Sequence, residues 1–444
     1  MNRKRSGRTL KTGFTTGAAA AAAAKAALLC LLTGERVELV SLTMLNGEHR
    51  EIPVKQPRLL DSRTCECIVV KDAGDDPDVT HQAEIGVRVW IVEDDAGMLD
   101  LSRRSFRAKP ECWDAGKEVG GQETEIRGQR SVVSEKREED GDRWSDVGGR
   151  RTEERGRETE VREKRAEAIE VPLDRSSGTV WIFGGTGVGR VTKPGLEIAP
   201  GLPAVTEGPR TMILQEIQEV FEQTGATGSV GVEIFVPQGE ALAKKTMNAR
   251  LGILGGISIL GTTGLVHPLS HEAYQASILA GIRVAAAAGC TTLVLTTGRR
   301  SERHAQTLRP DLPEEAFLQM GDFFEFAVKS AGEQGITNLV LAMFWGKAVK
   351  MAQGFPHTHA AKSALSLHKL GEWAAALSMD ARLVQAIQSA NTARQTFAMI
   401  EERLPELISE VGRRIQENAW RFGKNSLEIR VVILDFEGKP VFQG

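Results

Sequence analysis

The segment GGTGVGRVTKPGLEIAPG, residues 184–201, follows the short apolar run Val180–Phe183. Its first six positions hold four glycines, a residue that allows positive φ and close approach to a ligand. Lys193 is followed by Pro194, which fixes φ. The glycine spacing matches neither G-x-G-x-x-G nor G-x-x-x-x-G-K-[ST], so no standard nucleotide-binding motif is present. A structural turn and a ligand-binding loop are therefore both open interpretations of this segment.

Length and composition define the broad class of protein. A chain of 444 residues exceeds the usual size of one hydrophobic core, so we expect two domains. A net charge of -3 and a pI near 6.3 argue against a general nucleic-acid-binding protein. Five cysteines without C-x-x-C spacing favour reduced thiols in a cytoplasmic protein. Lys25 interrupts the apolar run 18–32 and no small-residue cleavage site follows, so we expect neither a signal peptide nor a membrane partner.

The first part of the chain predicts a β-rich α+β domain. Thr15 or Thr16 can cap an apolar helix over 18–32, which Gly34 ends. The start of this helix offers backbone N–H groups and two hydroxyls that suit an anionic ligand group, although an ordinary capped core helix has the same features. A further helix is predicted over 212–223. Strands are predicted over 37–45, 49–54, 64–71, 87–92, 169–171, 180–183 and 228–236.

Two charged segments lie within this domain. The turn DAGDDPDVTH, residues 72–81, clusters carboxylates, but its spacing matches no strong cation motif, and a solvated acidic loop is the commoner interpretation. From about 107 to 168 the chain is rich in Glu, Arg, Lys and Gly and poor in aliphatic residues. Such a segment buries too little apolar surface to offset its ordering entropy, which predicts a disordered or loosely helical insertion; a charged binding arm is the alternative.

The second part of the chain alternates strands with helices. Strands are predicted over 257–260, 292–295, 338–343 and 427–436, and helices from His271, over 301–308 and 347–353, and between 359 and 422. This order predicts an α/β domain with a mostly parallel sheet that binds ligands at the carboxyl ends of its strands. The loops 261–264, 296–300 and 344–347 are then expected along one edge. We place the domains at 9–240 and 241–444.

The histidines do not complete a recognised metal motif. His267 and His271 are separated by Pro268, which disfavours a helical ligand pair. His357 and His359 flank Thr358, a spacing that suits a metal or an acidic ligand, but no further Cys or carboxylate motif completes a metal site. We therefore predict no metal site.

Several motifs together resemble one known family. LKTGFTTG (10–17), VVKDAGDDPDVTH (69–81), GGTGVGRVTKPGL (184–196), ARLGILGGISILGTTGLVHPLS (249–270) and HTH (357–359) are similar to the cobalt-precorrin-5B C-1 methyltransferase family, CbiD. The resemblance implies S-adenosylmethionine-dependent methylation of C-1 of cobalt-precorrin-5B, giving cobalt-precorrin-6A in anaerobic cobalamin biosynthesis. Cobalt is then part of a small corrinoid substrate, with no nucleic-acid or membrane partner; a homo-oligomer stays open.

The resemblance and the loops together suggest site residues. Methyl transfer depends mainly on alignment of donor and acceptor, and an electron-rich macrocycle carbon needs little general-base assistance. Candidates for orienting the reacting ring or handling a proton are Asp72 and His81. The expected cofactor-binding residues are Gly184, Gly185, Gly187, Gly189, Gly261, Thr262, Thr263 and Gly264. The expected substrate-binding residues are Thr15, Thr16, Lys193, Arg250, Arg299, Lys347 and His359.

Two other functions remain to be separated from this one. The sequence departs from the family pattern at Ala18, Ala19 and Gln82 and in the loops near 297–299, 343–344 and 357–360, which favours a non-catalytic protein that binds corrinoid intermediates as the main alternative. A dinucleotide-dependent reductase is weaker because no strand is followed by the required glycine fingerprint.

Overall fold

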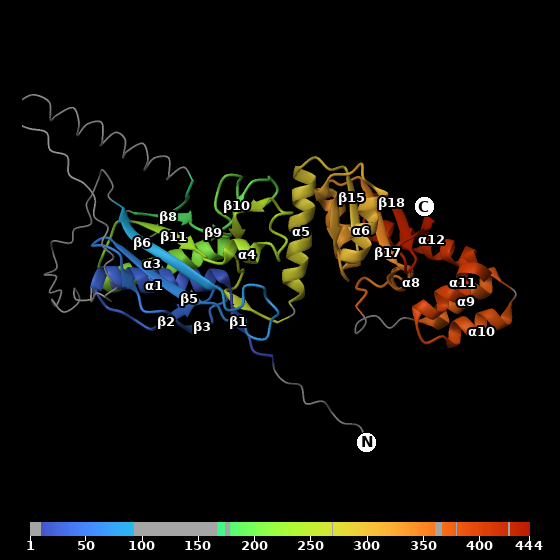
Figure 1. Ribbon diagram of the computed structural model, residues 1–444, viewed down its shortest axis with the longest axis horizontal. Helices are drawn as coiled ribbons and strands as arrows, with labels where there is room; N and C mark the ends of the chain where they lie inside the picture. Colours follow the sequence, from blue (N-terminus) through green and yellow to red (C-terminus); the bar gives the residue numbers. More distant parts are fainter. Residues whose placement is uncertain are drawn as a thin grey trace, which may run out of the picture.

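The computed structural model describes residues 10–92, 167–173, 178–268, 270–359, 366–378, 380–424 and 427–444. They form an elongated molecule in which an N-terminal α+β unit and a C-terminal α/β unit lie on either side of helix α5 (His271–Ala287), as Figure 1 shows. Each unit has its own large apolar core. The predicted fold class is therefore confirmed. Most of the predicted charged insertion lies outside the described residues.

The N-terminal unit is built on a six-stranded sheet of order β4-β5-β6-β11-β8-β7, in which only the β8–β11 pair is parallel. These strands are β4 (Arg58–Leu59), β5 (Thr64–Val70), β6 (Glu84–Val92), β7 (Ile169–Pro172), β8 (Thr179–Gly184) and β11 (Ser229–Phe235). Helix α1 (Thr16–Thr33) packs against the sheet and against α3 (Glu207–Thr224). Strands β2 (Leu39–Thr43) and β3 (His49–Pro53) form the predicted hairpin.

Helix α1 is a core helix. Thr15 caps its start by accepting a hydrogen bond from Ala18 N–H, and Gly34, with φ of 77°, ends it. By length and composition it could cross a membrane, but 89% of that window is buried inside the protein. Its one charged residue, Lys25, forms ion pairs with Glu216 at 2.6 Å and Glu219 at 2.7 Å. Because these carboxylates neutralise Lys25, the helix can lie in the interior.

Three two-stranded sheets tie residues 253–266 to the N-terminal unit: β1-β14, β9-β13 and β10-β12. Their strands are β1 (Gly13–Phe14), β9 (Gly187–Val188), β10 (Arg190–Val191), β12 (Ile253–Leu254), β13 (Gly256–Ile257) and β14 (Leu265–Val266). Short helix α4 (Gly239–Ala243) lies between β11 and β12 in the chain. The predicted continuous strand 257–260 is wrong, because pairing breaks after Ile257 and resumes only as an isolated Val205–Ile259 bridge. We therefore propose that the units divide between Val266 and His271, not at 240.

The C-terminal unit contains a five-stranded sheet of order β16-β15-β17-β18-β19. Its first four strands are parallel and β19 is antiparallel. They are β15 (Thr292–Thr296), β16 (Phe317–Gln319), β17 (Asn338–Phe344), β18 (Glu428–Leu434) and β19 (Pro440–Gln443). The helices are α6 (Arg299–Leu308), α7 (Phe324–Glu333), α8 (Trp345–Ala352), α9 (Leu367–Leu377), α10 (Ala381–Ser389), α11 (Ala393–Arg403) and α12 (Pro405–Phe422), with a 3-10 turn at Glu314–Ala316. The parallel pairing brings the loops after β15, β16 and β17 to one edge.

Candidate functional site

A polar network occupies the carboxyl edge of the C-terminal sheet. Asp322 follows β16, and Lys347 lies in the first turn of α8, directly after β17. Asp322 Oδ1 accepts hydrogen bonds from Lys347 Nζ and from Thr358 Oγ1, the latter at 2.9 Å. The Thr358 N–H donates to Asp322 O at 2.9 Å, and Lys350 Nζ donates to Thr358 O at 3.1 Å. These bonds fix the fully buried Thr358, and with it the segment 357–359.

This network carries more positive than negative charge. Burial alone would raise the pKa of Asp322, but hydrogen bonds from Lys347 and Thr358 outweigh it, so the pKa of Asp322 lies below its ordinary value. Burial and the neighbouring Lys347 lower the pKa of Lys350. Two lysines thus share one ionised carboxylate, which suits the binding of anionic groups.

A cluster of aromatic and histidine rings lies next to this network. The His357 ring meets the Phe323 ring edge-on, with centroids 4.7 Å apart, and the His271 ring at 5.3 Å. Tyr274, the one tyrosine of the chain, stacks on Phe323 at 5.2 Å. The backbone N–H of His359 donates to His357 Nδ1 at 3.3 Å, and the His359 side chain is exposed. The rings therefore provide a partly apolar surface beside the lysines.

Asp72 and His81 lie close together in the N-terminal unit. Lys11 Nζ is 2.6 Å from Asp72 Oδ2 and lowers the pKa of Asp72, with help from the Gly74 N–H. His81 Nδ1 accepts a hydrogen bond from Ala73 N–H at 3.1 Å and is 3.9 Å from Asp72 Oδ1. The accepting Nδ1 leaves the proton of a neutral His81 on Nε2. Asp72 is therefore a weakened base, and His81 can present an N–H donor.

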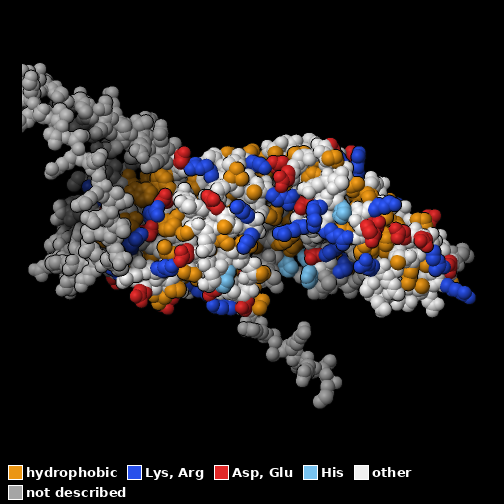
Figure 2. All heavy atoms as spheres, in the orientation of Figure 1, with side chains coloured by type: hydrophobic (Ala, Val, Ile, Leu, Met, Phe, Trp, Pro, Cys, Tyr) orange, Lys and Arg blue, Asp and Glu red, His pale blue; other side chains and the backbone are white. Residues whose placement is uncertain are grey.

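The strand pairing brings this loop near the histidine cluster. The Phe14 N–H donates to Asp72 O at 2.8 Å, and Gly13 pairs with Val266 across β1-β14. Val266 precedes His271 by five residues, at most about 18 Å of extended chain. Figure 1 shows β1 on the side of the molecule at which the chain enters α5. Figure 2, in the same orientation, shows basic side chains and histidines across the middle of the face that is turned to the viewer. The Asp72–His81 loop and the histidine cluster therefore lie near the boundary between the units.

The glycines of segment 184–189 lie against the protein's own atoms. The atom nearest to an added Cβ is Pro203 Cβ for Gly184 (2.7 Å), Glu233 Cδ for Gly185 (3.0 Å), Val236 O for Gly187 (1.9 Å) and Ile253 Cγ2 for Gly189 (2.4 Å). Gly187 also has a φ of 74°. Internal packing therefore accounts for these glycines, and their predicted contact with a cofactor stays a prediction.

The second glycine loop, 261–264, closes over the start of α1. Thr15 N–H donates to Gly264 O at 2.9 Å, and Thr16 Oγ1 accepts from Leu260 N–H at 2.9 Å. An added Cβ on Gly261 would meet Thr15 Oγ1 at 2.3 Å, and one on Gly264 would meet the Met44 sulfur at 2.5 Å. Thr263 Oγ1 accepts from Leu265 N–H at 3.3 Å, whereas Thr262 is exposed. The Thr15 backbone N–H and the Thr16 hydroxyl thus hold this loop, and contact of these threonines with substrate stays a prediction.

Lys193 and Arg250 form ion pairs across the boundary between the units. Lys193 Nζ is 2.5 Å from Glu315 Oε1. Arg250 Nη2 is 2.7 Å from Glu302 Oε1 and donates to Phe317 O at 3.2 Å. Gly195, two residues after Lys193, packs on α5, because an added Cβ would meet Arg283 O at 2.5 Å. Both cations therefore have protein partners here, which substrate carboxylates would have to replace.

Arg299 differs from these two cations. It begins α6, directly after the loop 297–298, and is exposed. Within the part of the chain that the structure describes, Arg299 has no ion-pair partner. The neighbouring Arg300 instead donates to Phe436 O and lies over the Phe344 ring, 4.8 Å from its centroid. Arg299 is consequently the predicted substrate-binding cation that is most available to a ligand.

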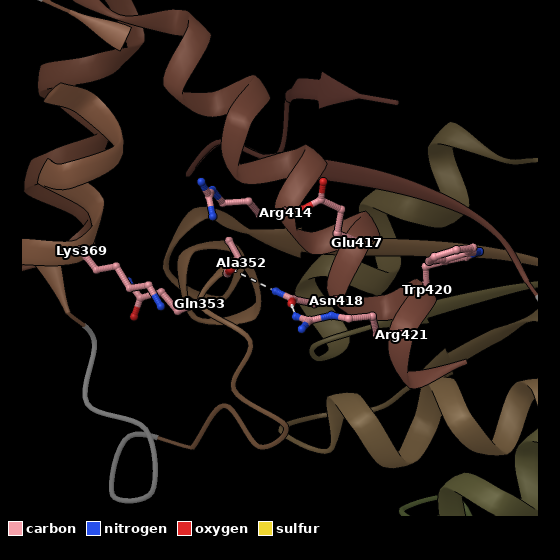
Figure 3. A pocket seen from close by; sticks show the side chains of 8 residues that line it. All are labelled: Ala352, Gln353, Lys369, Arg414, Glu417, Asn418, Trp420 and Arg421. Atoms are coloured by element: carbon pink, nitrogen blue, oxygen red, sulfur yellow. Dashed lines mark hydrogen bonds between the residues drawn. The ribbon is translucent and has the colours of Figure 1, made fainter. Parts of the chain in front are cut away.

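A separate hollow of about 450 Å³ lies among α8, α9 and α12 (Figure 3). Its lining residues are Ala352, Gln353, Lys369, Arg414, Glu417, Asn418, Trp420 and Arg421. Asn418 donates to the carbonyls of Met351 and Ala352 at the end of α8, at 2.8 and 3.0 Å. Arg414 lies 4.4 Å from the Trp373 ring centroid and pairs with Glu410. Contacts of this kind hold helices together, and none of the predicted site residues lines the hollow.

Sequence reasoning missed several members of the edge network. Asp322 follows β16, a strand of three residues that has no clear period. Tyr274 and Phe323 resemble ordinary core residues in the sequence. The spacing of His357 and His359 suggests a metal or an acidic ligand, but not the packing of the His357 ring against Phe323. If β16 had been recognised as a strand, Asp322 could have been identified, because it lies just after the carboxyl end of that strand.

The described residues define a two-domain protein whose α/β unit presents a basic, histidine-containing sheet edge near the domain boundary. The CbiD family model matches residues 3–103 and 153–268, and the model of the CbiD C-terminal domain matches residues 357–444.

The chain also resembles curated proteins, one of them over nearly its full length. It is 35% identical over 436 residues to the cobalt-precorrin-5B C(1)-methyltransferase of Salinispora arenicola, covering 97% of this chain and 92% of that protein. It is 43% identical over 268 residues to the protein of the same name from Nitratidesulfovibrio vulgaris, covering 60% and 69%. The crystal structure of the cobalamin biosynthesis protein cbiD from Archaeoglobus fulgidus matches at 22% identity and a TM-score of 0.33, covering 76% and 78%. The chain belongs to the CbiD family.

Proposed function

We propose that this protein is a methyltransferase of cobalamin biosynthesis that methylates C-1 of cobalt-precorrin-5B. The observation that carries the proposal is the similarity over 97% of the chain to a relative named for that reaction. A basic sheet edge is consistent with it, because a corrinoid precursor with peripheral carboxylates needs cationic partners.

We propose S-adenosylmethionine as the methyl donor, bound beside Gly298. When bound, it supplies an electrophilic methyl group on a sulfonium. An added Cβ on Gly298 would meet no atom within 4 Å, in contrast to the glycines of segments 184–189 and 261–264 that lie against the protein. Gly298 also precedes α6 at the carboxyl end of β15, the position at which α/β sheets bind ligands. The open loop therefore fits a donor better than the glycine-rich loops do.

Arg299 and Lys347 are the proposed partners of the substrate carboxylates. Arg299 is exposed, and Lys347 shares Asp322 with Thr358 in a network that already has a second ammonium at Lys350. A bidentate guanidinium and a positioned ammonium bind carboxylates with geometric specificity. Lys193 and Arg250 would contribute only if the units separate enough to release Glu315 and Glu302.

The proposed chemistry requires little from acids and bases. The electron pair of C-1 forms the new carbon–carbon bond while the carbon–sulfur pair returns to sulfur. Alignment and exclusion of water are then the main contributions of the protein. His81 would hold the ring through its Nε2–H, and Asp72, with its lowered pKa, would orient rather than accept a proton.

The direct test uses cobalt-precorrin-5B and methyl-labelled S-adenosylmethionine. We expect label at C-1, located by carbon-13 NMR, and release of S-adenosylhomocysteine. Corrinoid binding without label transfer would instead support the non-catalytic corrinoid-binding protein. The Arg299→Ala and Lys347→Ala variants should raise KM for the corrinoid more than they lower kcat, because they remove binding present before and during the reaction.

A further inference from the structure

The segment His357–His359 is held more firmly than an exposed loop requires. Thr358, between the two histidines, is fully buried and bonds Asp322 through both its N–H and its hydroxyl, each at 2.9 Å. Its carbonyl accepts from Lys350 at 3.1 Å and Lys347 at 3.4 Å. A threonine anchored on all sides leaves the neighbouring histidine side chains with restricted positions.

The two histidines differ in their surroundings. His357 Nδ1 accepts the His359 N–H at 3.3 Å, which places the proton of a neutral His357 on Nε2. The His357 ring also packs edge-on against both Phe323 and His271. His359 stands at the exposed end of the cluster, 6.2 Å from the His357 ring centroid. His357 therefore positions the segment, and His359 presents an imidazole at the surface.

Within the described ranges, no three His, Cys, Asp or Glu side chains converge to hold a metal ion. A cobalt corrinoid does not require such a set, because its macrocycle fills the equatorial positions and leaves only axial ones. Neutral imidazole is a common ligand for transition metals. One positioned histidine is thus sufficient for a metal that arrives within its substrate.

We propose that His359 binds the cobalt of the corrinoid substrate as an axial ligand. This inference rests on the proposed function, because the cobalt corrinoid is the substrate of that function. The imidazole lone pair forms a bond to cobalt, no group is transferred, and no oxidant or reductant is needed. Electron donation through cobalt enriches the macrocycle and makes C-1 a better nucleophile. Lys347 and Arg299 then bind carboxylates at the rim of a ring whose centre is held by His359.

The test is electron paramagnetic resonance of the protein with cobalt(II) cobyrinic acid, a carboxylate-bearing corrinoid without a nucleotide base. Binding through one imidazole nitrogen splits the cobalt hyperfine lines into triplets, which become doublets when the histidines carry nitrogen-15. We expect triplets in the wild-type protein, their loss in His359→Ala and their return when free imidazole is added to that variant. His368→Ala, an exposed histidine on α9, is the matched control and should keep the triplets.

Triplets that persist in His359→Ala, or that disappear only in His271→Ala, would overturn the assignment. So would bound corrinoid without nitrogen coupling in the wild-type protein. His357→Phe keeps a ring against Phe323 but removes the acceptor for His359; we expect roughly tenfold weaker binding with the triplets retained. Methyl transfer is measured separately. Methyl transfer without nitrogen coupling would refute axial ligation by His359 but not the methyltransferase activity. Nitrogen coupling without methyl transfer would refute the methyltransferase activity but not the axial ligation.

Discussion

Segment 184–189 and the loops at the carboxyl edge of the C-terminal sheet both lie at the ends of strands, yet their residues make different contacts. In the first, glycines allow main chains of β9 and β13 and the segment before α4 to approach each other closely. At the sheet edge, Asp322, Lys347, Lys350 and Thr358 join in hydrogen bonds, and Arg299 and His359 are exposed. The contrast teaches that internal packing can account for the glycines of such a loop, while strand-end polar residues give the better guide to a site.

The largest expected effect tests the packing half of this contrast. Gly187→Ala places a Cβ at 1.9 Å from Val236 O at a φ of 74°, so overpacking adds to left-handed strain. We expect a loss of about 3 kcal/mol or more in the free energy of unfolding, measured in urea. Gly255→Ala is the matched control, because Gly255 has a φ of 81° but open space around it. Its cost should stay near 1–2 kcal/mol; equal losses would show that φ, not packing, selects glycine.

The fold could be predicted where local signals were strong. Thr15, Gly34 and Ser270 mark helix ends, and the side chains of Thr15 and Ser270 accept the expected capping bonds. Strands β15 and β17 are apolar and long enough to recognise. In contrast, β16, α7 and β19 were missed, because three- or four-residue strands have little period and α7 lacks a capping side chain. Tertiary pairing, which no local pattern encodes, also divides the expected 257–260 strand.

The second prediction removes the centre of the edge network. Asp322→Asn keeps the shape of the side chain but loses the charge that Lys347 and Thr358 bind. We expect a loss of about 1–3 kcal/mol in unfolding free energy at pH 7, with weaker corrinoid binding. Because the folded pKa of Asp322 is lowered, its stabilisation is present above the ordinary value of 3.8 and is lost as pH falls through the folded pKa. The wild-type and variant stabilities should therefore converge in acid.

Unfolding curves from pH 3 to pH 7 provide the measurement. Asp311→Asn is a control, because Asp311 also pairs with a cation, at 2.7 Å from Arg309, but is exposed and precedes β16, whereas Asp322 follows that strand. A constant difference between wild type and Asp322→Asn across that range would contradict the ionic role of Asp322.

The site could be predicted only in part. Lys347 could be predicted because it follows a recognised strand. His359 could be predicted because it belongs to the histidine pair 357 and 359. The partners of Lys193 and Arg250 are separated from them by 122 and 52 residues, and no sequence pattern announces such a contact. Chain topology, not local chemistry, brings the carboxylates of Glu315 and Glu302 to these cations.

The third prediction tests the exposed cation at the edge. Arg299→Ala should weaken binding of cobyrinic acid by about tenfold, about 1.4 kcal/mol, because a charged hydrogen bond to a carboxylate is lost. Thermal stability should be unchanged, since Arg299 is exposed and has no ion-pair partner within the described ranges. Arg303→Ala, an exposed arginine one turn further along α6, controls for the loss of positive charge. If both variants bind equally weakly, general electrostatic attraction replaces a specific contact.

The smallest effect concerns Lys193, which follows the glycines of segment 184–189 in the chain and pairs with Glu315 of the C-terminal unit. Its ammonium lowers the pKa of Glu315 from across the domain boundary, but both side chains are partly exposed, at 34% and 20%. Their coupling in a double-mutant cycle should be about 0.2–1 kcal/mol. If Lys193 mainly joins the units, Lys193→Glu and Glu315→Lys should each reduce stability slightly, and the exchanged pair should restore both stability and KM. If Lys193 binds a substrate carboxylate after the units separate, the exchanged pair restores stability alone and KM stays raised. Calorimetry and steady-state kinetics on the same four proteins distinguish a structural ion pair from a substrate-binding one.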